Sequence, residues 1–228
     1  MEQFTQLPSG EKSDLTPIEK LVYLYLRKYM NEETKEAFPS QGTIAKDSGL
    51  SRPTIIKAIN GLVKADYIEK YSYEGRQTHY KFKKLLKFEP FSYMFLENKD
   101  IRPLDKAYII ASQEFMFKDI PGEGKIDYSS KELGKLINMP SRTIRECEQG
   151  LAEQGYLTTK TGNNEVTSKI FDLNKLGQAV IWKLKEHEEV LDNHEDRIAK
   201  LEEENKKQQE LIKKLLKDKE KKDVQLFL

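Results

Sequence analysis

The segment from Arg52 onward carries apolar residues at the spacing of an amphipathic helix. Ser51 is a residue type favoured at the N-cap, and Pro53 falls in the first turn, where its missing N–H costs little. The apolar positions that follow the i, i+3, i+4, i+7 pattern of a buried stripe are Ile55, Ala58, Ile59 and Leu62. The polar and basic residues between them are therefore expected on the outward face of the helix.

Two further helices are predicted before this one. Ser40 is a typical N-cap for a short helix that points Ile44 inward, and Gly49 supplies the left-handed backbone that ends this helix. The turn to the next helix is then about three residues long, which is helix-turn-helix spacing. An earlier helix begins at Thr16 and Pro17. Its apolar stripe consists of Ile18, Leu21, Val22, Tyr25 and Leu26.

A β-hairpin is predicted after the third helix. Side chains alternate in character from Tyr67 to Phe82, and Glu74 and Gly75 interrupt the run. Alternation around a turn that contains glycine is typical of a hairpin. Three helices followed by a hairpin are the elements of a winged helix, and we assign residues 15–88 to the first such domain.

A diverged second copy of the pattern lies 89 residues further along the chain. The matching pairs are Thr54/Thr143, Ile55/Ile144, Gly61/Gly150, Leu62/Leu151 and Tyr67/Tyr156. The first helix of this copy lies in "RPLDKAYIIASQEFMF", and Ser129 and Glu132 have the spacing of a capping box. Ser141 is expected to cap the last helix, and Gly162 and Asn163 to form the hairpin turn. We assign residues 103–176 to a second winged helix.

Two segments flank the predicted domains. Residues 1–14 are assigned to an N-terminal tail. The segment 89–102, between the two copies, is rich in Phe, Tyr, Met and Leu. A flexible linker would instead be dominated by Gly, Ser or charged residues. We therefore expect this apolar linker to pack on one domain or at a dimer interface.

The C-terminal part of the chain has the heptad pattern of a coiled coil and contains no Pro or Gly. The positions expected at the dimer interface are Leu184, Leu191, Ile198, Leu201, Asn205, Ile212 and Leu215. Asn205 favours a parallel homodimer, because two buried amides satisfy each other only in register. A net charge of −5 over residues 183–204 and +4 over residues 205–223 would also suit antiparallel pairing. We assign residues 177–223 to the coil and residues 224–228 to an apolar tail. The pattern of this tail favours a frayed helix end, and the alternative is a docking peptide for a protein partner.

Composition narrows the class of protein. With 34% charged and 37% hydrophobic residues, the chain suits small modules better than one large core. Cys147 is the only cysteine, so an intramolecular disulfide and a cysteine-based metal cluster are excluded, and it replaces Ala58 on a buried stripe. No apolar run approaches the roughly 20 residues of a membrane span, and the N-terminus lacks a signal-peptide pattern. We expect a cytoplasmic protein with no cofactor, no metal and no membrane partner.

The sequence contains no arrangement of residues that is typical of an active site. The segment "PGEGKID" lacks the Ser or Thr and the full spacing of a phosphate-binding loop. Neither a Ser-His-Asp set nor a pair of carboxylates can be argued from the spacing. We therefore expect no catalytic residues and no enzymatic activity.

Charge is distributed unevenly, although the net charge of the whole chain is only +1. Residues 41–88 contain ten basic and four acidic residues, whereas residues 129–171 contain six basic and five acidic ones. The second helix of a helix-turn-helix enters the major groove, where Arg or Lys can read guanine, Asn can read adenine and apolar groups can contact a thymine methyl. The charge pattern therefore favours double-stranded DNA as a partner of the first copy.

The candidate DNA-binding residues follow from these placements. In the first copy they are Arg52, Thr54, Ile56, Lys57, Asn60 and Lys64 on the helix, and Arg76, His79 and Lys81 on the hairpin. In the second copy they are Arg142, Arg145 and Gln149. Glu146 and Glu153 share the outward face of the second helix, so we expect this copy to be the poorer DNA reader. The alternative for all of these residues is an ordinary solvated surface, and lysines on a hairpin also discourage edge pairing.

The stretch "FPSQGTIAKDSGLSRPTIIKAINGLVKADYIEK", residues 38–70, resembles the winged helix-turn-helix domains at the N-termini of phage and plasmid replication proteins. It is also similar to the GntR-type transcription regulators. The resemblance covers roughly residues 15–85 and implies that Arg52, Thr54 and Lys57 lie in the major groove, with the hairpin around Arg76 on the backbone. Neither a GntR-type effector domain nor a polymerase, helicase or loader module follows.

These patterns together predict a mainly α protein with small β-hairpins, an α+β fold of tandem winged helices followed by a C-terminal coiled coil. The predicted function is that of a dimeric, sequence-specific binder of double-stranded DNA, acting in phage or plasmid replication or in transcription regulation. The alternative is a non-enzymatic scaffold in which the winged helices bind protein. Fold alone does not decide between the two.

Overall fold

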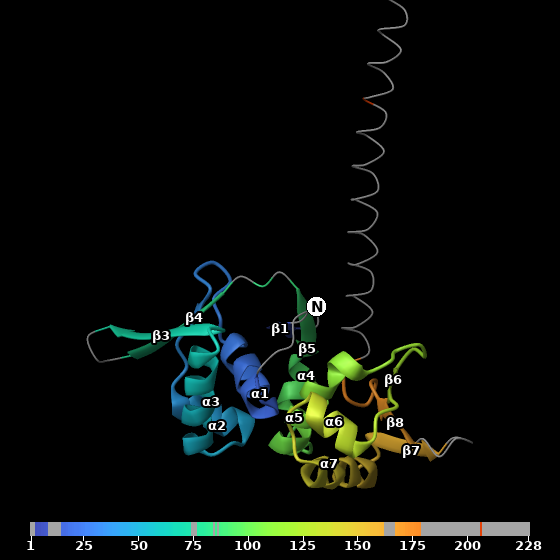
Figure 1. The fold of residues 1–228 in the computed structure, drawn as a ribbon. Helices are drawn as coiled ribbons and strands as arrows, with labels where there is room; N and C mark the ends of the chain where they lie inside the picture. Colours follow the sequence, from blue (N-terminus) through green and yellow to red (C-terminus); the bar gives the residue numbers. More distant parts are fainter. Residues whose placement is uncertain are drawn as a thin grey trace, which may run out of the picture. The chain divides into compact units, whose positions relative to one another are not determined.

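The computed structural model describes residues 3–8, 15–73, 77–83, 85, 87–161, 167–178 and residue 206. Contacts divide the chain into two compact units, Met1–Trp182 and Lys183–Leu228. The first unit has a mixed α/β fold in which helices pack beside small antiparallel sheets (Figure 1). Within the described part of the chain, every helix is too short or too polar to cross a membrane.

The first half of this unit contains the three helices and the hairpin that the sequence predicts. The elements in chain order are α1 (Pro17–Arg27), β2 (Glu36–Ala37), α2 (Gln41–Ser48), α3 (Arg52–Lys64), β3 (Ile68–Tyr73) and β4 (Gln77–Phe82). The strands β3 and β4 pair antiparallel, with Ile68 opposite Phe82. The two-residue strand β2, which no sequence pattern indicated, pairs with the other edge of β4 to give the order β2-β4-β3.

The second half repeats this order of elements. They are α5 (Pro103–Ser112), the 3-10 helix η1 (Gln113–Phe115), β6 (Glu123–Ile126), α6 (Ser130–Leu136), α7 (Ser141–Glu153), β7 (Leu157–Thr161) and β8 (Thr167–Asp172). The sheet order β6-β8-β7 matches that of the first half. The predicted hairpin turn at Gly162 and Asn163 lies outside the described residues.

Two predictions for the second half concern single residues. Ser141 was expected to cap α7, but this is wrong, because Pro140 occupies the N-cap with extended backbone and Ser141 is the first helical residue. Without a side-chain acceptor at Pro140, the helix has no side-chain cap bond. Cys147 is buried, as predicted, and burial raises the pKa of its thiol.

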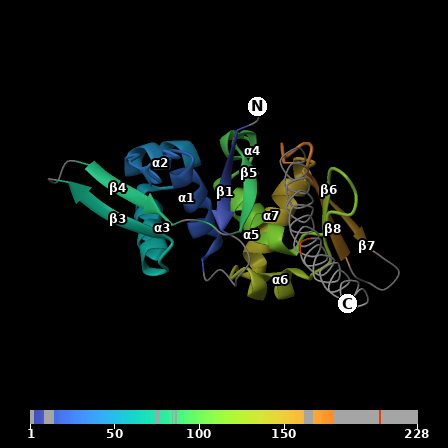
Figure 2. The same cartoon turned by 90° about the horizontal axis from the view of Figure 1, so that it is seen from above.

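The apolar segment between the two halves is folded and packed. β5 (Phe88–Ser92) pairs antiparallel with β1 (Phe4–Pro8), and α4 (Tyr93–Glu97) follows β5 directly. Phe91, Phe95 and Leu96 are buried, which agrees with the expectation that this linker packs on a domain. Figure 2 shows the β1–β5 ribbon between the helices of the first half and those of the second. No pattern in the sequence predicted β1.

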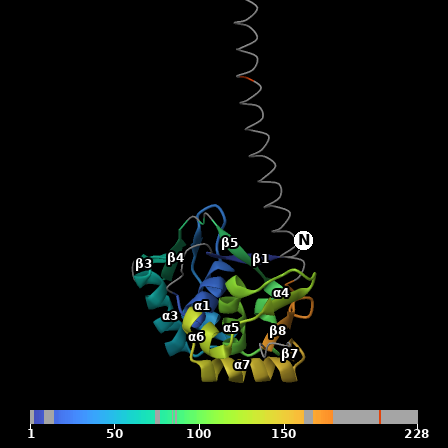
Figure 3. The same cartoon turned by 45° about the vertical axis from the view of Figure 1, so that its right-hand side comes forward.

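The helix α1 is buried on nearly every side. The stripe predicted from the sequence faces the core, but Tyr23 and Leu24, which lie outside that stripe, are fully buried too. The reason is that α1 packs against α3 in its own half and against α5 in the second half (Figures 1 and 3). The two halves therefore share one continuous apolar core.

A glycine at the same position of α3 and α7 allows close approach of the first helix in each half. A Cβ on Gly61 would lie 1.8 Å from Glu19 Oε1. That carboxylate forms a capping box with Thr16, whose backbone N donates to Glu19 Oε2 at 2.7 Å. A Cβ on Gly150 would lie 2.7 Å from Arg102 Nη2. The Gly61/Gly150 match in the sequence therefore reflects the packing of a polar helix start against the third helix.

The contact between α1 and α5 contains a buried lysine. The Lys106 Nζ donates to the Leu96 carbonyl at 2.5 Å, and the Tyr25 hydroxyl donates to the same oxygen at 2.5 Å. Lys106 is 3% exposed. Burial lowers its pKa from 10.5 to about 8, and the charge of Lys99 adds to this effect, while Glu97 opposes it. One residue from each half thus binds the carbonyl at the end of α4.

This pKa shift predicts that Lys106 lowers the free energy of unfolding by an amount that depends on pH. Between pH 8 and 10.5 the unfolded chain holds the Lys106 proton and the folded chain does not. The free energy of unfolding therefore rises with pH through that window. Below pH 8 the destabilisation by the buried charge is present in full. We expect Lys106→Met to raise the free energy of unfolding at pH 7 by about 2 kcal/mol. In denaturant titrations this gain should shrink by pH 9.5, while a Tyr25→Phe control shows no such trend. A gain of equal size at both pH values would contradict the assignment.

A buried ion pair holds α7 in the second half. Glu148 Oε1 accepts from the Tyr108 hydroxyl at 2.9 Å and lies 3.5 Å from Lys169 Nζ, while Oε2 accepts from Ser130 Oγ at 3.0 Å. The side chains of Glu148 and Lys169 are only 13% and 5% exposed. In the first half the position of Glu148 is taken by the buried Ile59. The second half therefore uses a polar network where the first uses apolar packing.

Removing one partner of the ion pair between Glu148 and Lys169 should lower the free energy of unfolding. We expect Glu148→Ile to lower the free energy of unfolding by about 3 kcal/mol, because the charge of Lys169 is left buried and unpaired. Adding Lys169→Met should recover most of that loss, since an apolar pair can replace a buried ion pair of similar volume. Urea denaturation of the single and double variants measures this. A double variant no more stable than Glu148→Ile would refute it.

Candidate nucleic-acid interface

The helices α2 and α3 are joined by a short turn and begin in the same way. Ser40 Oγ accepts from the backbone N of Thr43 at 3.0 Å, and Ser51 Oγ accepts from that of Thr54 at 3.4 Å. Each serine hydroxyl is also 2.8 Å from the hydroxyl of the same threonine. Gly49 ends α2 with φ of 71°, a left-handed conformation that glycine adopts without strain. The predicted helix-turn-helix is therefore built as the sequence indicated.

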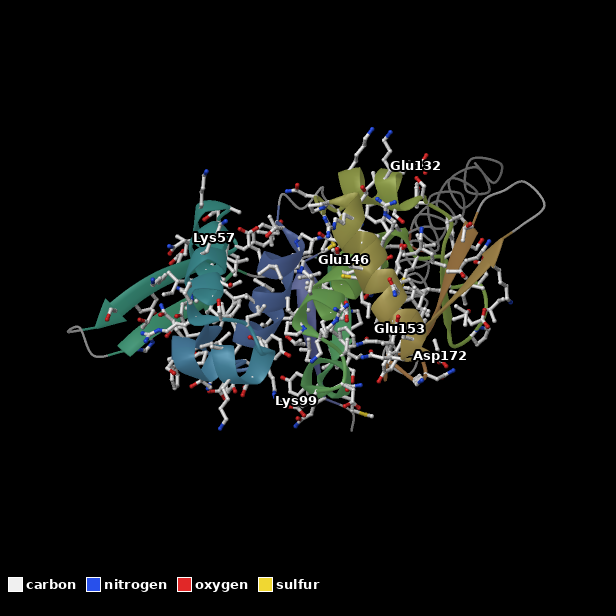
Figure 4. The ribbon with its side chains drawn as sticks, turned by 90° about the horizontal axis from the view of Figure 1, so that it is seen from below. Lys57, Lys99, Glu132, Glu146, Glu153 and Asp172 are labelled. Carbon is white, nitrogen blue, oxygen red and sulfur yellow. The ribbon has the colours of Figure 1, made fainter. Side chains whose placement is uncertain are left out.

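The orientation of α3 follows from its apolar stripe. Ile55, Ala58, Ile59 and Leu62 are buried, as predicted. Arg52, Lys57, Asn60 and Lys64 are exposed on the opposite side, together with Ile56, and α3 contains no acidic residue. Figure 4 shows Lys57 on α3. The structure thus brings five of the six candidate residues of this helix together on one accessible face.

Thr54 is the exception on this helix. Its side chain is half-buried, and its hydroxyl is engaged with that of Ser51 at 2.8 Å. A hydroxyl bound in the cap is a poor candidate for hydrogen bonding to a base edge. The contact that Thr54 can offer a thymine is therefore through its methyl group.

The helix α2 contributes a side chain that the sequence analysis missed. Gln41 is the first residue of α2, and its Oε1 accepts from Arg52 Nε at 3.5 Å. No periodic pattern marks Gln41, because its role depends on the approach of two helices. The Tyr29 hydroxyl donates to Asp47 and thereby links the end of α1 to α2. Burial, and then the bond to Asp47, raises the pKa of Tyr29 to about 12.

The hairpin residues lie in surroundings less favourable for phosphate contact. His79 stacks on Tyr71 with ring centroids 5.3 Å apart, and its Nδ1 lies 3.6 Å from Glu36 Oε2. Lys81 is exposed, but its neighbours across the sheet are Glu36 on β2 and Glu69 on β3. Arg76, the predicted residue at the turn, lies outside the described residues.

The helix α7 of the second half has its polar groups paired along its own surface. Arg142 Nε donates to Glu146 Oε1 at 2.9 Å, and Gln149 Nε2 donates to Glu153 Oε1 at 2.9 Å. Arg145 is exposed. With the same offset that aligns the repeats, Glu146 and Glu153 occupy the positions of the two lysines of α3 (Figure 4). The structure therefore gives α3 and α7 the same place in each half and different surface chemistry.

The predicted positions at the C-terminal end remain untested. The proposed dimer residues Leu184, Leu191, Ile198, Leu201, Asn205, Ile212 and Leu215 and the apolar tail at residues 224–228 lie outside the described residues.

Comparison with known proteins supports the presence of a helix-turn-helix domain in the first half. Residues 13–68 match the family model for a helix-turn-helix domain. The match runs from just before α1 to the first residue of β3, about a quarter of the chain. No curated protein matches the chain significantly. Since helix-turn-helix domains place their second helix in the major groove, the match suggests DNA binding by the segment that contains α2 and α3.

Proposed function

We propose that this chain binds double-stranded DNA sequence-specifically and that α3 of the first half reads bases in the major groove. The observation that carries the proposal is the exposed face of α3, which offers Arg52, Lys57, Asn60 and Lys64 and lacks any acid. Each of these residue types can contact a base edge or a phosphate. The helix-turn-helix match to the same segment supports DNA as the partner.

Both halves are winged helices in this proposal, and they act unequally. The shared order of helices and strands and the shared sheet order support the tandem arrangement. Arg142 pairs with Glu146, so α7 offers less free positive charge than α3. Lys131 and Lys135 on α6 are exposed and add positive charge beside α7. The second winged helix therefore adds affinity through phosphate contacts or forms an interface, and it does not dominate base reading.

The proposed protein is a homodimer held by a C-terminal coiled coil, with parallel pairing favoured by Asn205. Pairing two chains would present two copies of α3 to two half-sites. The second half-site is then met at high effective concentration, so individually weak contacts give useful affinity. The biological role that fits is a phage or plasmid replication initiator or a transcription regulator, without enzymatic activity.

The alternative is a scaffold in which the winged helices bind protein. The observation that favours it is the exchange of Lys57 and Lys64 for Glu146 and Glu153 in the second half. Binding to duplex DNA near 150 mM salt separates the two proposals, because non-specific phosphate attraction weakens steeply with salt. Fluorescence anisotropy with random and selected duplexes over a salt series measures this directly. Absence of binding at that salt would favour the scaffold.

Paired alanine variants test the inequality of the two halves. We expect Arg52→Ala with Lys57→Ala to weaken binding to a selected site by about 100-fold, because two contacts of about 1 to 3 kcal/mol each are lost. The double variant Arg142→Ala with Arg145→Ala, on α7, should cost less than about ten-fold. Anisotropy at one fixed salt concentration compares the unmodified chain with the two double variants. Equal losses from both pairs would overturn the proposed asymmetry.

A reciprocal charge exchange tests whether the lysine positions set the difference. Lys57→Glu gives α3 the residue found at that position of α7, and we expect it to abolish binding to the selected site. Glu146→Lys gives α7 the residue of α3 and frees Arg142, so affinity for any duplex should rise. The slope of log affinity against log salt should steepen by about 1 to 2 for this variant. An unchanged slope would show that α7 does not face DNA.

A further inference from the structure

The side chain of Arg52 contacts the preceding helix. Arg52 is the first residue of α3 and Gln41 is the first residue of α2. The hydrogen bond from Arg52 Nε to Gln41 Oε1, 3.5 Å long, spans the helix-turn-helix. Gln41 is partly exposed and Arg52 is exposed, so both lie at the surface where the proposed interface begins.

The contact with Gln41 uses only Nε of the Arg52 guanidinium, and this determines which donors remain for DNA. A guanidinium has five N–H donors in one plane, of which Nε carries one and the two terminal nitrogens carry four. Binding through Nε leaves Nη1 and Nη2 as a pair of parallel donors at the far end of the side chain. Guanine presents two acceptors, N7 and O6, in the major groove, whereas adenine presents one acceptor and one donor. The free end of Arg52 therefore matches guanine.

Polar groups on α2 and at the start of α3 have hydrogen-bond partners of their own. The carboxylate of Asp47, on α2, accepts from the Tyr29 hydroxyl. The Ser51 and Thr54 hydroxyls bind each other at 2.8 Å. Since α3 contains no acid, its own surface offers no ion pair to Arg52.

The second half lacks the same arrangement. By the repeat offset, Gln41 is replaced by Ser130 and Arg52 by Ser141. The Ser130 hydroxyl donates to the buried Glu148 at 3.0 Å, and the nearby Arg142 pairs with Glu146 on its own helix. The arrangement therefore belongs to the half that the proposed function assigns to base reading.

We propose that Gln41 is a positioning residue that orients Arg52 and that Arg52 reads a guanine in the major groove. This inference rests on the proposed function, and it specifies one base and one supporting residue of that site. A bound side chain samples fewer rotamers before it meets DNA, so less freedom is lost on binding. Loss of Gln41 should therefore weaken discrimination at one base pair more than it weakens affinity for random duplexes.

The test compares one guanine with its modified form. Duplexes selected from a random pool by the full-length protein identify the preferred site, and 7-deazaguanine, which lacks the N7 acceptor, replaces each guanine in turn. At the guanine read by Arg52 we expect the unmodified chain to lose about five-fold or more in affinity. Arg52→Ala should bind both duplexes equally. The ratio of the affinity for the guanine duplex to that for the 7-deazaguanine duplex measures this contact. Gln41→Ala should reduce this ratio at this position alone, by about three-fold or more.

Two controls separate positioning from a general effect on the helix. Gln41→Glu retains an acceptor for Arg52 Nε and should keep the ratio, although its negative charge lowers affinity for every duplex. Lys46→Ala removes an exposed charge from the same helix and should lower affinity for all duplexes alike. Circular dichroism spectra of the variants show whether the helices are retained.

The outcomes distinguish this inference from the proposed function. A selected site with a guanine whose 7-deaza effect disappears in Arg52→Ala and shrinks in Gln41→Ala supports both. A selected site at which Gln41→Ala leaves every ratio unchanged overturns the positioning role only. A selected site without a guanine sensitive to Arg52 overturns the base assignment. If the protein selects no site, the proposed function fails, and this inference fails with it.

Discussion

The packing of α1 is the constraint on which the rest of the first unit depends. This helix supports α3 on one side and α5 on the other, so its removal from water requires both halves of the unit. Burial of whole side chains such as Tyr23 and Leu24 supplies about 1.5 to 3 kcal/mol each, before the cost of ordering the chain. The same packing fixes α3 on its apolar face and leaves its basic face exposed. The candidate DNA-binding surface is thus a consequence of the core.

Local patterns in the sequence were sufficient for the helices and hairpins. The buried residues of α3, the caps at Ser40 and Ser51 and the paired strands β3 and β4 agree with the predictions, because each depends on neighbours within one or two turns of chain. The cap of α7 is a local exception, because Pro140 stands where Ser141 was expected. The other features that were missed depend on distant contacts. The strand β1 exists only because β5 pairs with it from at least 80 residues away. Gln41 likewise acquires its role from the approach of a second helix, which no spacing along the chain reveals.

The two halves show how one arrangement of elements can acquire different chemistry. Ile59 and Glu148 occupy equivalent positions, yet one packs in an apolar core and the other anchors a buried network with Tyr108 and Lys169. On the outward side, lysine is exchanged for glutamate. Repeated topology therefore predicts where a helix lies but not what it binds. The difference in surface chemistry between α3 and α7 lies in side chains that a shared fold leaves free to vary.

Contact between α3 and bases in the major groove can be tested by photocrosslinking. Duplexes in which 5-iodouracil replaces thymine place a photoreactive atom in the major groove, at the position of the thymine methyl. Irradiation of the complex, followed by digestion and mass spectrometry, identifies the peptide that is attached. We expect attachment within residues 52–64. Attachment confined to α7 or to the hairpin of the first half, in a complex that still selects its site, would contradict it.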